Sequence, residues 1–156
     1  MSIWSQVAGI IRIDDIRALD SEFDFDELIG KECLWNDDMS VWDDQEKHPE
    51  KYMPMGSEGS LQKSIWVNPN TSCLDAYTVS IFGSLRDHTD VDGIIEWFKK
   101  VCNKCWVRNA TITIENDLVG IKNYTYNPEV DNTDVYMDFE REPYNPEIWI
   151  KGVTYE

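Results

Sequence analysis

Apolar and polar residues alternate along several short stretches of the chain, which is the pattern typical of β-strands. Residues 3–13 carry Val7, Ile11 and Ile13 on one face, with further apolar residues on the other. Apolar residues on both faces predict a central strand of a sheet. Similar patterns predict further strands over 61–67, 76–85, 107–114, 118–126 and 148–153.

A helical spacing of apolar residues is clearest over residues 89–102. Ile94, Phe98 and Val101 fall on one stripe there, and Thr89 is the expected N-cap. Residues 15–29 show a weaker version of this spacing and predict one or two short helices. Gly30 is well placed to end the second of these, because glycine is common just beyond a helix C-terminus.

Residues 31–60 have little periodicity and predict a long irregular connection. His48-Pro49 and Met53-Pro54 break regular structure, and Gly56-Ser-Glu-Gly59 favours a turn into the next strand. Connections beyond about 15 residues are usually functional or disordered. Trp35 and Trp42 argue against disorder, because disordered chains are poor in aromatic residues.

The predicted order is strand, helix, strand, strand, helix, strand, which indicates an α+β fold. We expect a mostly antiparallel sheet with two main helices, a ferredoxin-like (split βαβ) core, and an extra C-terminal hairpin and tail. No linker or internal repeat is apparent, so residues 1–156 are expected to form a single domain. Many unrelated functions share this fold, so the fold alone indicates none of them.

Charge is distributed unevenly along the chain. The 156 residues include 30 acidic and 14 basic ones, for a net charge of −16. Residues 14–50 account for −11 of this and residues 129–147 for −6, so the remainder is close to neutral. Such a charge repels nucleic acid and anionic membranes and favours basic partners.

The densest acidic stretch, residues 35–46, contains two tryptophans. An aromatic anchor surrounded by charge is typical of a protein-binding hot spot. The alternative is that Trp35 and Trp42 fold back and hold a long loop against the sheet. Trp4, Trp66, Trp97 and Trp149 fall in regular elements and are expected in the core. The residues predicted to bind a partner are Trp35, Asp37, Asp38, Trp42, Asp43, Asp44 and Glu46.

No catalytic or metal-binding motif stands out. Cys102-Asn-Lys-Cys105 lies at the end of the predicted helix, where the dipole does not favour a reactive thiolate. A structural zinc site needs four ligands, and the other cysteines and histidines are scattered. We therefore expect buried cysteines, with no catalytic residue, metal or cofactor. Neither a nucleophile elbow nor a phosphate-binding glycine loop is present.

No segment of the sequence resembles a secretory signal or a membrane span. The expected location is the cytoplasm, where cysteines stay reduced.

Four short segments together resemble small accessory proteins encoded by bacteriophages. They are Met1-Ser-Ile-Trp4, the Gly9-x-Ile11-x-Ile13 strand, the Met55-Gly-Ser-Glu-Gly-Ser60 loop and Ile94-Ile-Glu-Trp-Phe98. Phage proteins of this size and acidity include inhibitors of host defence, such as anti-CRISPR and anti-restriction proteins. Several of these act as DNA mimics by displaying carboxylates. The resemblance implies that class, and it supplies no catalytic residues.

The leading hypothesis is a non-enzymatic inhibitor that binds a basic, nucleic-acid-binding protein of a bacterial host. A first alternative is another interaction protein, either a toxin-immunity protein or a subunit of a phage particle. A second alternative is an enzyme or small-molecule binder with a pocket near Trp35, His48 and His88. Direct binding to nucleic acid or membrane is not expected, and homo-oligomerisation is left open.

Overall fold

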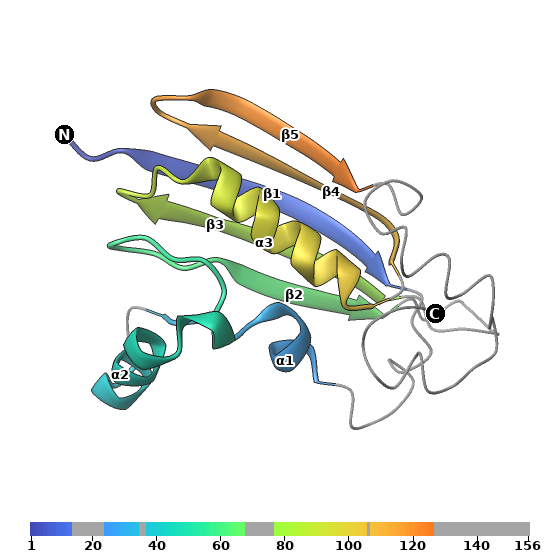
Figure 1. Cartoon of the computed structure of the whole chain (residues 1–156), viewed down its shortest axis with the longest axis horizontal. Helices are drawn as coiled ribbons and strands as arrows, with labels where there is room; N and C mark the ends of the chain where they lie inside the picture. The colour runs from blue at the N-terminus through green and yellow to red at the C-terminus, as the bar shows by residue number, and fades with distance from the viewer. Residues whose placement is uncertain (14–23, 35–36, 68–76, 106, 127–156) are drawn as a thin grey trace.

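The computed structural model describes residues 1–13, 24–34, 37–67, 77–105 and 107–126. They form an α+β fold in which a five-stranded antiparallel sheet is combined with three α-helices (Figure 1). The predicted class and the mostly antiparallel sheet are therefore confirmed. The predicted strand over 148–153 and the acidic segment 129–147 lie outside the described residues.

The sheet is built around β1 (Trp4–Ile13), which is the central strand, as predicted. It pairs with β3 (Tyr77–Arg86) on one side and β4 (Val107–Asn116) on the other. The edges are β2 (Gln62–Val67), beside β3, and β5 (Gly120–Tyr126), beside β4. The order is thus β2-β3-β1-β4-β5, with every neighbouring pair antiparallel.

One face of the sheet is covered by α3 (Val91–Asn103), the long helix drawn in front of the sheet and nearly in line with its strands in Figure 1. Its apolar stripe is buried as predicted, with Ile94 and Phe98 at most 1% exposed. The N-cap is Asp90 rather than the predicted Thr89, because the Asp90 carboxylate accepts a hydrogen bond of 2.9 Å from the Gly93 amide. A side chain at Gly93 would meet this carboxylate, so glycine leaves the space that the cap needs.

Three short helical segments lie on the side of the molecule where β2 forms the sheet edge (Figure 1). They are α1 (Phe25–Ile29), α2 (Met39–Lys47) and the 3-10 turn η2 (Pro49–Lys51). The prediction of an irregular segment over 31–60 was wrong for α2. The prediction of two main helices also needs correction, because α3 alone is long among the helices of the described residues.

The predicted helical region 15–29 is described only in part. Residues 14–23 lie outside the described residues, and α1 occupies the rest. Gly30 ends α1 as expected, with φ of 121° and its amide donating to the Asp26 carbonyl. A conformation with positive φ is open to glycine at little cost.

The hydrophobic core lies between α3 and the sheet. Ile11, Val79 and Ile112 from three adjacent strands are fully buried, and Cys102 and Cys105 join them, as expected for unreactive structural cysteines.

The tryptophans only partly follow the prediction that they are core residues. Trp97 packs against the core and Trp4 is half-buried. Trp66 is 55% exposed, which corrects the prediction. Its place in the β2–β3 register puts it on the face with Phe82, opposite the face that α3 covers. Trp149 lies outside the described residues.

The β4–β5 hairpin forms as predicted, with its turn slightly later in the chain. Asn116 is the last residue of β4 and pairs with Gly120, so three residues form the loop. The Asn116 side-chain oxygen accepts hydrogen bonds from the amides of Leu118 and Val119. Gly120 has φ of +89°, as a three-residue hairpin loop requires at this position.

Candidate functional site

The predicted partner-binding segment is organised by the start of α2. The Asp38 carboxylate is the N-cap and accepts hydrogen bonds from the Ser40 hydroxyl and amide and from the Val41 amide. These bonds lower the pKa of Asp38, with the Ser40 hydroxyl making the largest contribution. An aspartate at this position supplies the acceptor that the first free amides of a helix need.

The two sides of α2 differ in exposure. Trp42 and Val41 are half-buried on the inner side, whereas Asp43 and Glu46 are exposed on the outer side. Residues three apart lie next to each other on a helix surface, so these two carboxylates are neighbours. Met39, one turn before Asp43, is 72% exposed. The outer side of α2 therefore carries two carboxylates and one exposed apolar side chain, with the exposed Lys47 one turn after Asp43.

Two of the predicted acidic residues hold the segment together. The Tyr52 hydroxyl donates a hydrogen bond of 2.7 Å to Asp44. This bond lowers the pKa of Asp44 and raises the pKa of Tyr52 to about 12. The Asp37 carboxylate accepts a hydrogen bond of 2.6 Å from the Leu34 amide. Asp37 and Asp44 thus have structural partners, while Asp43 and Glu46 show none among the described residues.

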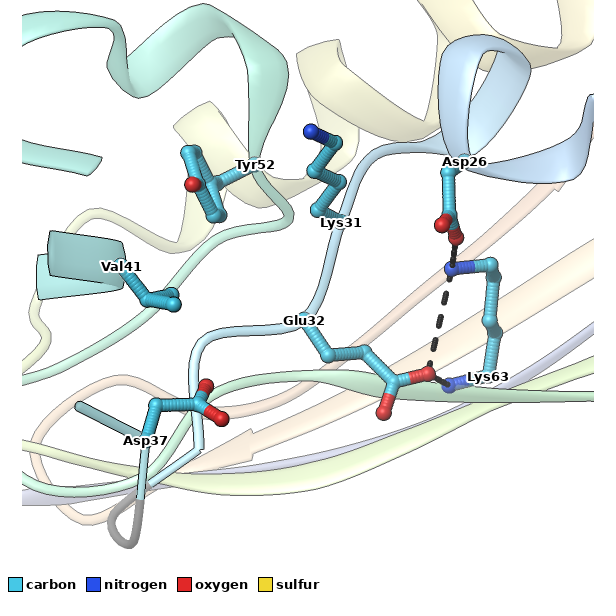
Figure 2. A pocket seen from close by; sticks show the side chains of 7 residues that line it. All are labelled: Asp26, Lys31, Glu32, Asp37, Val41, Tyr52 and Lys63. Carbon is cyan, nitrogen blue, oxygen red and sulfur yellow. Dashed lines mark hydrogen bonds and ion pairs between the residues drawn. The ribbon is translucent and has the colours of Figure 1, made fainter. Parts of the chain in front are cut away.

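A small pocket of about 370 Å³ separates α2 from β2 and α1 (Figure 2). Figure 2 shows the carboxylates of Glu32 and Asp37 on one side of it and Lys31 extending between Tyr52 and Asp26. The side chains that line the pocket are Asp26, Lys31, Glu32, Asp37, Val41, Tyr52 and Lys63.

Lys63 closes the β2 side of this pocket and is only 7% exposed. Its ammonium group contacts Asp26 and donates to the Gly30 carbonyl at 2.9 Å. It also lies 3.8 Å from a carboxylate oxygen of Glu32. A buried ammonium is tolerated because it is paired and hydrogen-bonded. The contacts tie β2 to α1, so these charges have a structural role.

A larger groove of about 620 Å³ runs beside α3. Apolar side chains from α3 and from the segment after η2 line much of it, including Trp97, Met53 and Met55. His88 is also in its wall, and burial lowers the pKa of this histidine, an effect that Asp90 partly opposes. The groove has the size of small-molecule sites, although charged side chains such as Glu96 and Lys100 share its wall with the apolar ones.

The structure brings only part of the alternative enzyme site together. His88 lines the groove, but His48 is about half exposed and its imidazole lies 3.4 Å from the Glu50 carboxylate. Trp35 lies outside the described residues. The predicted grouping of Trp35, His48 and His88 around one pocket therefore rests on His88 alone.

The described residues do not include a group of three or more histidine, cysteine, aspartate or glutamate side chains placed to hold a metal ion. Cys33, Cys102 and Cys105 are buried free thiols, and burial, with a smaller effect of Asp37, raises the pKa of Cys33. In the part of the chain that the structure covers, every helix is too short or too polar to cross a lipid bilayer.

The sequence pattern missed three features of this site: the helix α2, the exposed Met39 and the groove beside α3. A signal for α2 was present, since Asp38 is a strong N-cap residue followed by Val41, Trp42 and Gln45 at helical spacing. The groove has no local signal, because it forms between segments about 40 residues apart in the chain.

In comparisons with known proteins, no family model, no curated protein and no solved structure matches the chain. Any function must therefore be argued from the geometry above.

Proposed function

We propose that the protein is a non-enzymatic inhibitor that binds a basic, nucleic-acid-binding protein in the cytoplasm of a bacterial host. The observation that carries this proposal is the outer side of α2, where Asp43 and Glu46 stand beside the exposed Met39. Carboxylates spaced along a surface can replace phosphates against arginine and lysine. The target's nucleic-acid groove would then be occupied by protein, which is inhibition by DNA mimicry.

The way α2 is held supports this role. Asp38 and Asp44 are engaged in the N-cap and in the bond to Tyr52, and these contacts fix how the helix is oriented. No residue of α2 is fully buried, so the helix contributes little to the core. The outer residues Asp43, Glu46 and Met39 are therefore available to a partner. Met39 replaces Trp42 as the expected apolar anchor, because Trp42 is half-buried.

A pull-down from bacterial lysate at low salt, with the full chain as bait, tests this function. We expect basic, DNA-binding proteins to be recovered and to be released as salt rises, because salt screens exposed charges over about 8 Å at physiological ionic strength. The double variant Asp43→Asn/Glu46→Gln should lose them. The matched control Glu27→Gln/Glu96→Gln makes the same change in charge away from α2 and should retain them.

A recovered target should also lose its affinity for duplex DNA when this protein is added. Recovery of no basic protein at low salt would refute the proposal. If the recovered protein is instead a toxin or a component of a phage particle, the immunity-protein or particle-subunit alternative would replace it.

The groove beside α3 favours a second candidate function, binding of a small molecule. Its volume suits a ligand of drug size, its wall offers both apolar and charged side chains, and His88 would supply a neutral imidazole for hydrogen bonding. A ligand screen followed by NMR would test this. Shifts at Trp97 and Val101 that disappear in His88→Ala would support it, and the absence of any ligand that shifts these residues would count against it.

We also infer that the core has the ferredoxin-like, split βαβ arrangement, with β5 as an added edge strand. The strand order β2-β3-β1-β4 and the passage of α3 between β3 and β4 support this description. Its first half requires a helix between β1 and β2 beside α3. Only α1 and α2 are described there, so an experimental structure that places residues 14–23 would test the assignment.

A further inference from the structure

The face of the sheet opposite α3 has few charges for so acidic a protein. This open face is made by Gln6, Ala8, Ile10 and Arg12 of β1 and by the residues in register with them across the other strands. Arg12 and Glu115 are the only charged residues among them, and Arg86, in register with Trp4 at the end of the same face, is paired with Glu58. The protein as a whole carries −16.

Apolar side chains are exposed in the middle of the open face. Ile10 is 46% exposed and Phe82 is 43% exposed. Phe82 pairs with Ala8 in the β1–β3 register, which places it diagonally next to Ile10. Exposed apolar groups that lie together on a surface with few charges are typical of an interaction site.

Arg12 and Glu115 lie at opposite ends of the open face. Arg12 is in register with Asn109, and Glu115 is in register with Gln6, six residues away along β1. Six residues of an antiparallel strand span about 20 Å. Arg12 and Glu115 of one chain are therefore too far apart to form an ion pair with each other.

A second copy would bring these charges together. Consider a two-fold axis that lies between two open faces and runs perpendicular to the strands. It reverses the strand direction, so the Arg12 end of one β1 lies over the Gln6 end of the other. Arg12 then approaches Glu115 of the second copy, because β4 is next to β1, and the contact occurs twice. The same operation places Phe82 over Ile10 of the second copy.

We propose that the protein forms a homodimer in which the open faces of two sheets pack against each other about this axis. Five strands at about 4.8 Å spacing and up to ten residues long give a face of roughly 700 Å². Stable interfaces bury about 600–1,000 Å² per partner, so a face of this size falls within that range. Repulsion between two chains of −16 opposes association elsewhere on the surface, whereas the open face has few charges and adds little repulsion. This surface lies apart from the outer side of α2, so the dimer does not depend on the function proposed above.

Sedimentation equilibrium of the full chain tests the dimer through a charge exchange. We expect a dimer that is favoured as salt rises, because salt screens the overall repulsion. Arg12→Glu and Glu115→Arg should each weaken dimerisation about tenfold, since each places like charges in contact. The double variant Arg12→Glu/Glu115→Arg should recover the dimer, and the separation of about 20 Å within one chain means that only a second copy can restore the pairs.

Two further variants separate the interface from general effects. Phe82→Ser should dissociate the dimer, whereas Leu118→Ser, which changes a residue 68% exposed in the β4–β5 loop, should leave it intact. A wild-type chain that stays monomeric at a protein concentration of about 1 mM would overturn the proposal. Its dissociation constant would then exceed about 1 mM, which corresponds to a binding free energy weaker than about 4 kcal/mol. A double variant that fails to recover the dimer would also overturn the proposal. A monomer in which Phe82 is protected from labelling would show that part of the same chain covers the face.

Discussion

The Tyr52 hydroxyl donates a hydrogen bond of 2.7 Å to Oδ2 of Asp44. Tyr52 is only 7% exposed and follows the turn η2, whereas Asp44 lies in α2, which has no fully buried residue. The bond therefore connects a peripheral helix to the core. It fixes the rotation of α2 about its own axis, and with it the direction in which Asp43 and Glu46 project.

Replacing Tyr52 with phenylalanine should loosen α2 while the sheet stays intact. The Tyr52→Phe variant retains the buried ring and removes only the hydroxyl. We expect amide hydrogen exchange in α2 to become several-fold faster, with exchange in β1 and β3 unchanged. Exchange measured by NMR at pH 7 tests this, and Tyr124→Phe, which removes a hydroxyl beside α3, is the matched control.

The same variant has an optical signature. The bond to Asp44 raises the pKa of Tyr52 to about 12, above the usual value of about 10. The neutral tyrosine is the form that the fold stabilises, so this contribution is present below about pH 10 and is lost as pH rises through about 12. Titration at 295 nm should show one late-ionising tyrosine that is absent in Tyr52→Phe. An unchanged titration curve would mean that the bond does not persist in solution.

The strands were predictable from the sequence because each buries one face and exposes the other. Ile112 and Ile114 of β4 alternate with Thr111 and Thr113, and both isoleucines are fully buried while the threonines are exposed. The helix α3 was predictable for the same reason, since its apolar residues recur at helical spacing and face the sheet. Where one face of an element is buried, apolar residues recur at the period of that element, and this pattern can be recognised in the sequence.

The helix α2 was not predicted because the contacts that stabilise it produce only a weak pattern of apolar residues in the sequence. It has no fully buried residue, so its apolar spacing is incomplete. It depends instead on the cap at Asp38 and on the contact with Tyr52, eight residues beyond Asp44. The separation of Asp38 and Asp44, which are structural, from Asp43 and Glu46, which are exposed, follows from these contacts. The sequence alone does not distinguish these four acidic residues, because each is simply a carboxylate in the same acidic stretch.

Acid should weaken the fold through three aspartates whose pKa values are lowered: Asp38, Asp44 and Asp87. Asp87 accepts a hydrogen bond of 2.9 Å from the Ser57 hydroxyl, which is the main cause of its shift. A lowered pKa in the folded state means that the stabilisation is present above the unfolded value of about 3.9. It is lost as pH falls through the folded values. Urea denaturation midpoints should therefore drop steeply below about pH 4.

The variant Asp38→Asn isolates the contribution of the helix cap to this acid effect. Asparagine also caps helices well, but it does not titrate. We expect a smaller drop in the urea midpoint between pH 5 and pH 2.5 than in the wild type. Asp43→Asn makes the same change in charge at an exposed carboxylate with no hydrogen bond among the described residues, and it should retain the full drop. Equal behaviour of the two variants would contradict the role of the cap.

Two glycines with similar backbone angles should respond differently to alanine. Gly59 has φ of +85° and Gly120 has φ of +89°, so alanine is conformationally strained at both, at about 1–2 kcal/mol. A Cβ at Gly59 would lie 2.1 Å from the Ser84 carbonyl oxygen, whereas one at Gly120 has nothing within 4 Å. Gly59→Ala should therefore lower the free energy of unfolding by about 2 kcal/mol more than Gly120→Ala, measured in urea. Equal losses would show that the Gly56–Gly59 turn shifts to make room.

Asn116 should be the most sensitive polar residue of the β4–β5 hairpin. It is 2% exposed, and its amide nitrogen donates to the Ser5 hydroxyl at 2.8 Å and to the His88 carbonyl at 3.2 Å. Its oxygen accepts from two loop amides, so a single side chain joins β1, the segment before α3 and the hairpin loop. Removing a group that satisfies buried partners costs about 1–3 kcal/mol, and Asn116→Ala should fall at the upper end.

The control for Asn116→Ala is Asn123→Ala in β5. Asn123 is exposed and accepts a single hydrogen bond of 2.7 Å, from the Thr113 hydroxyl. Water replaces that partner, so the free energy of unfolding should change by less than about 0.5 kcal/mol. Because His88 lines the groove beside α3, Asn116→Ala should also shift the NMR signals of Trp97, whereas Asn123→Ala should not. A stable Asn116→Ala variant with an unshifted Trp97 would mean that the hairpin loop and the His88 segment are held independently.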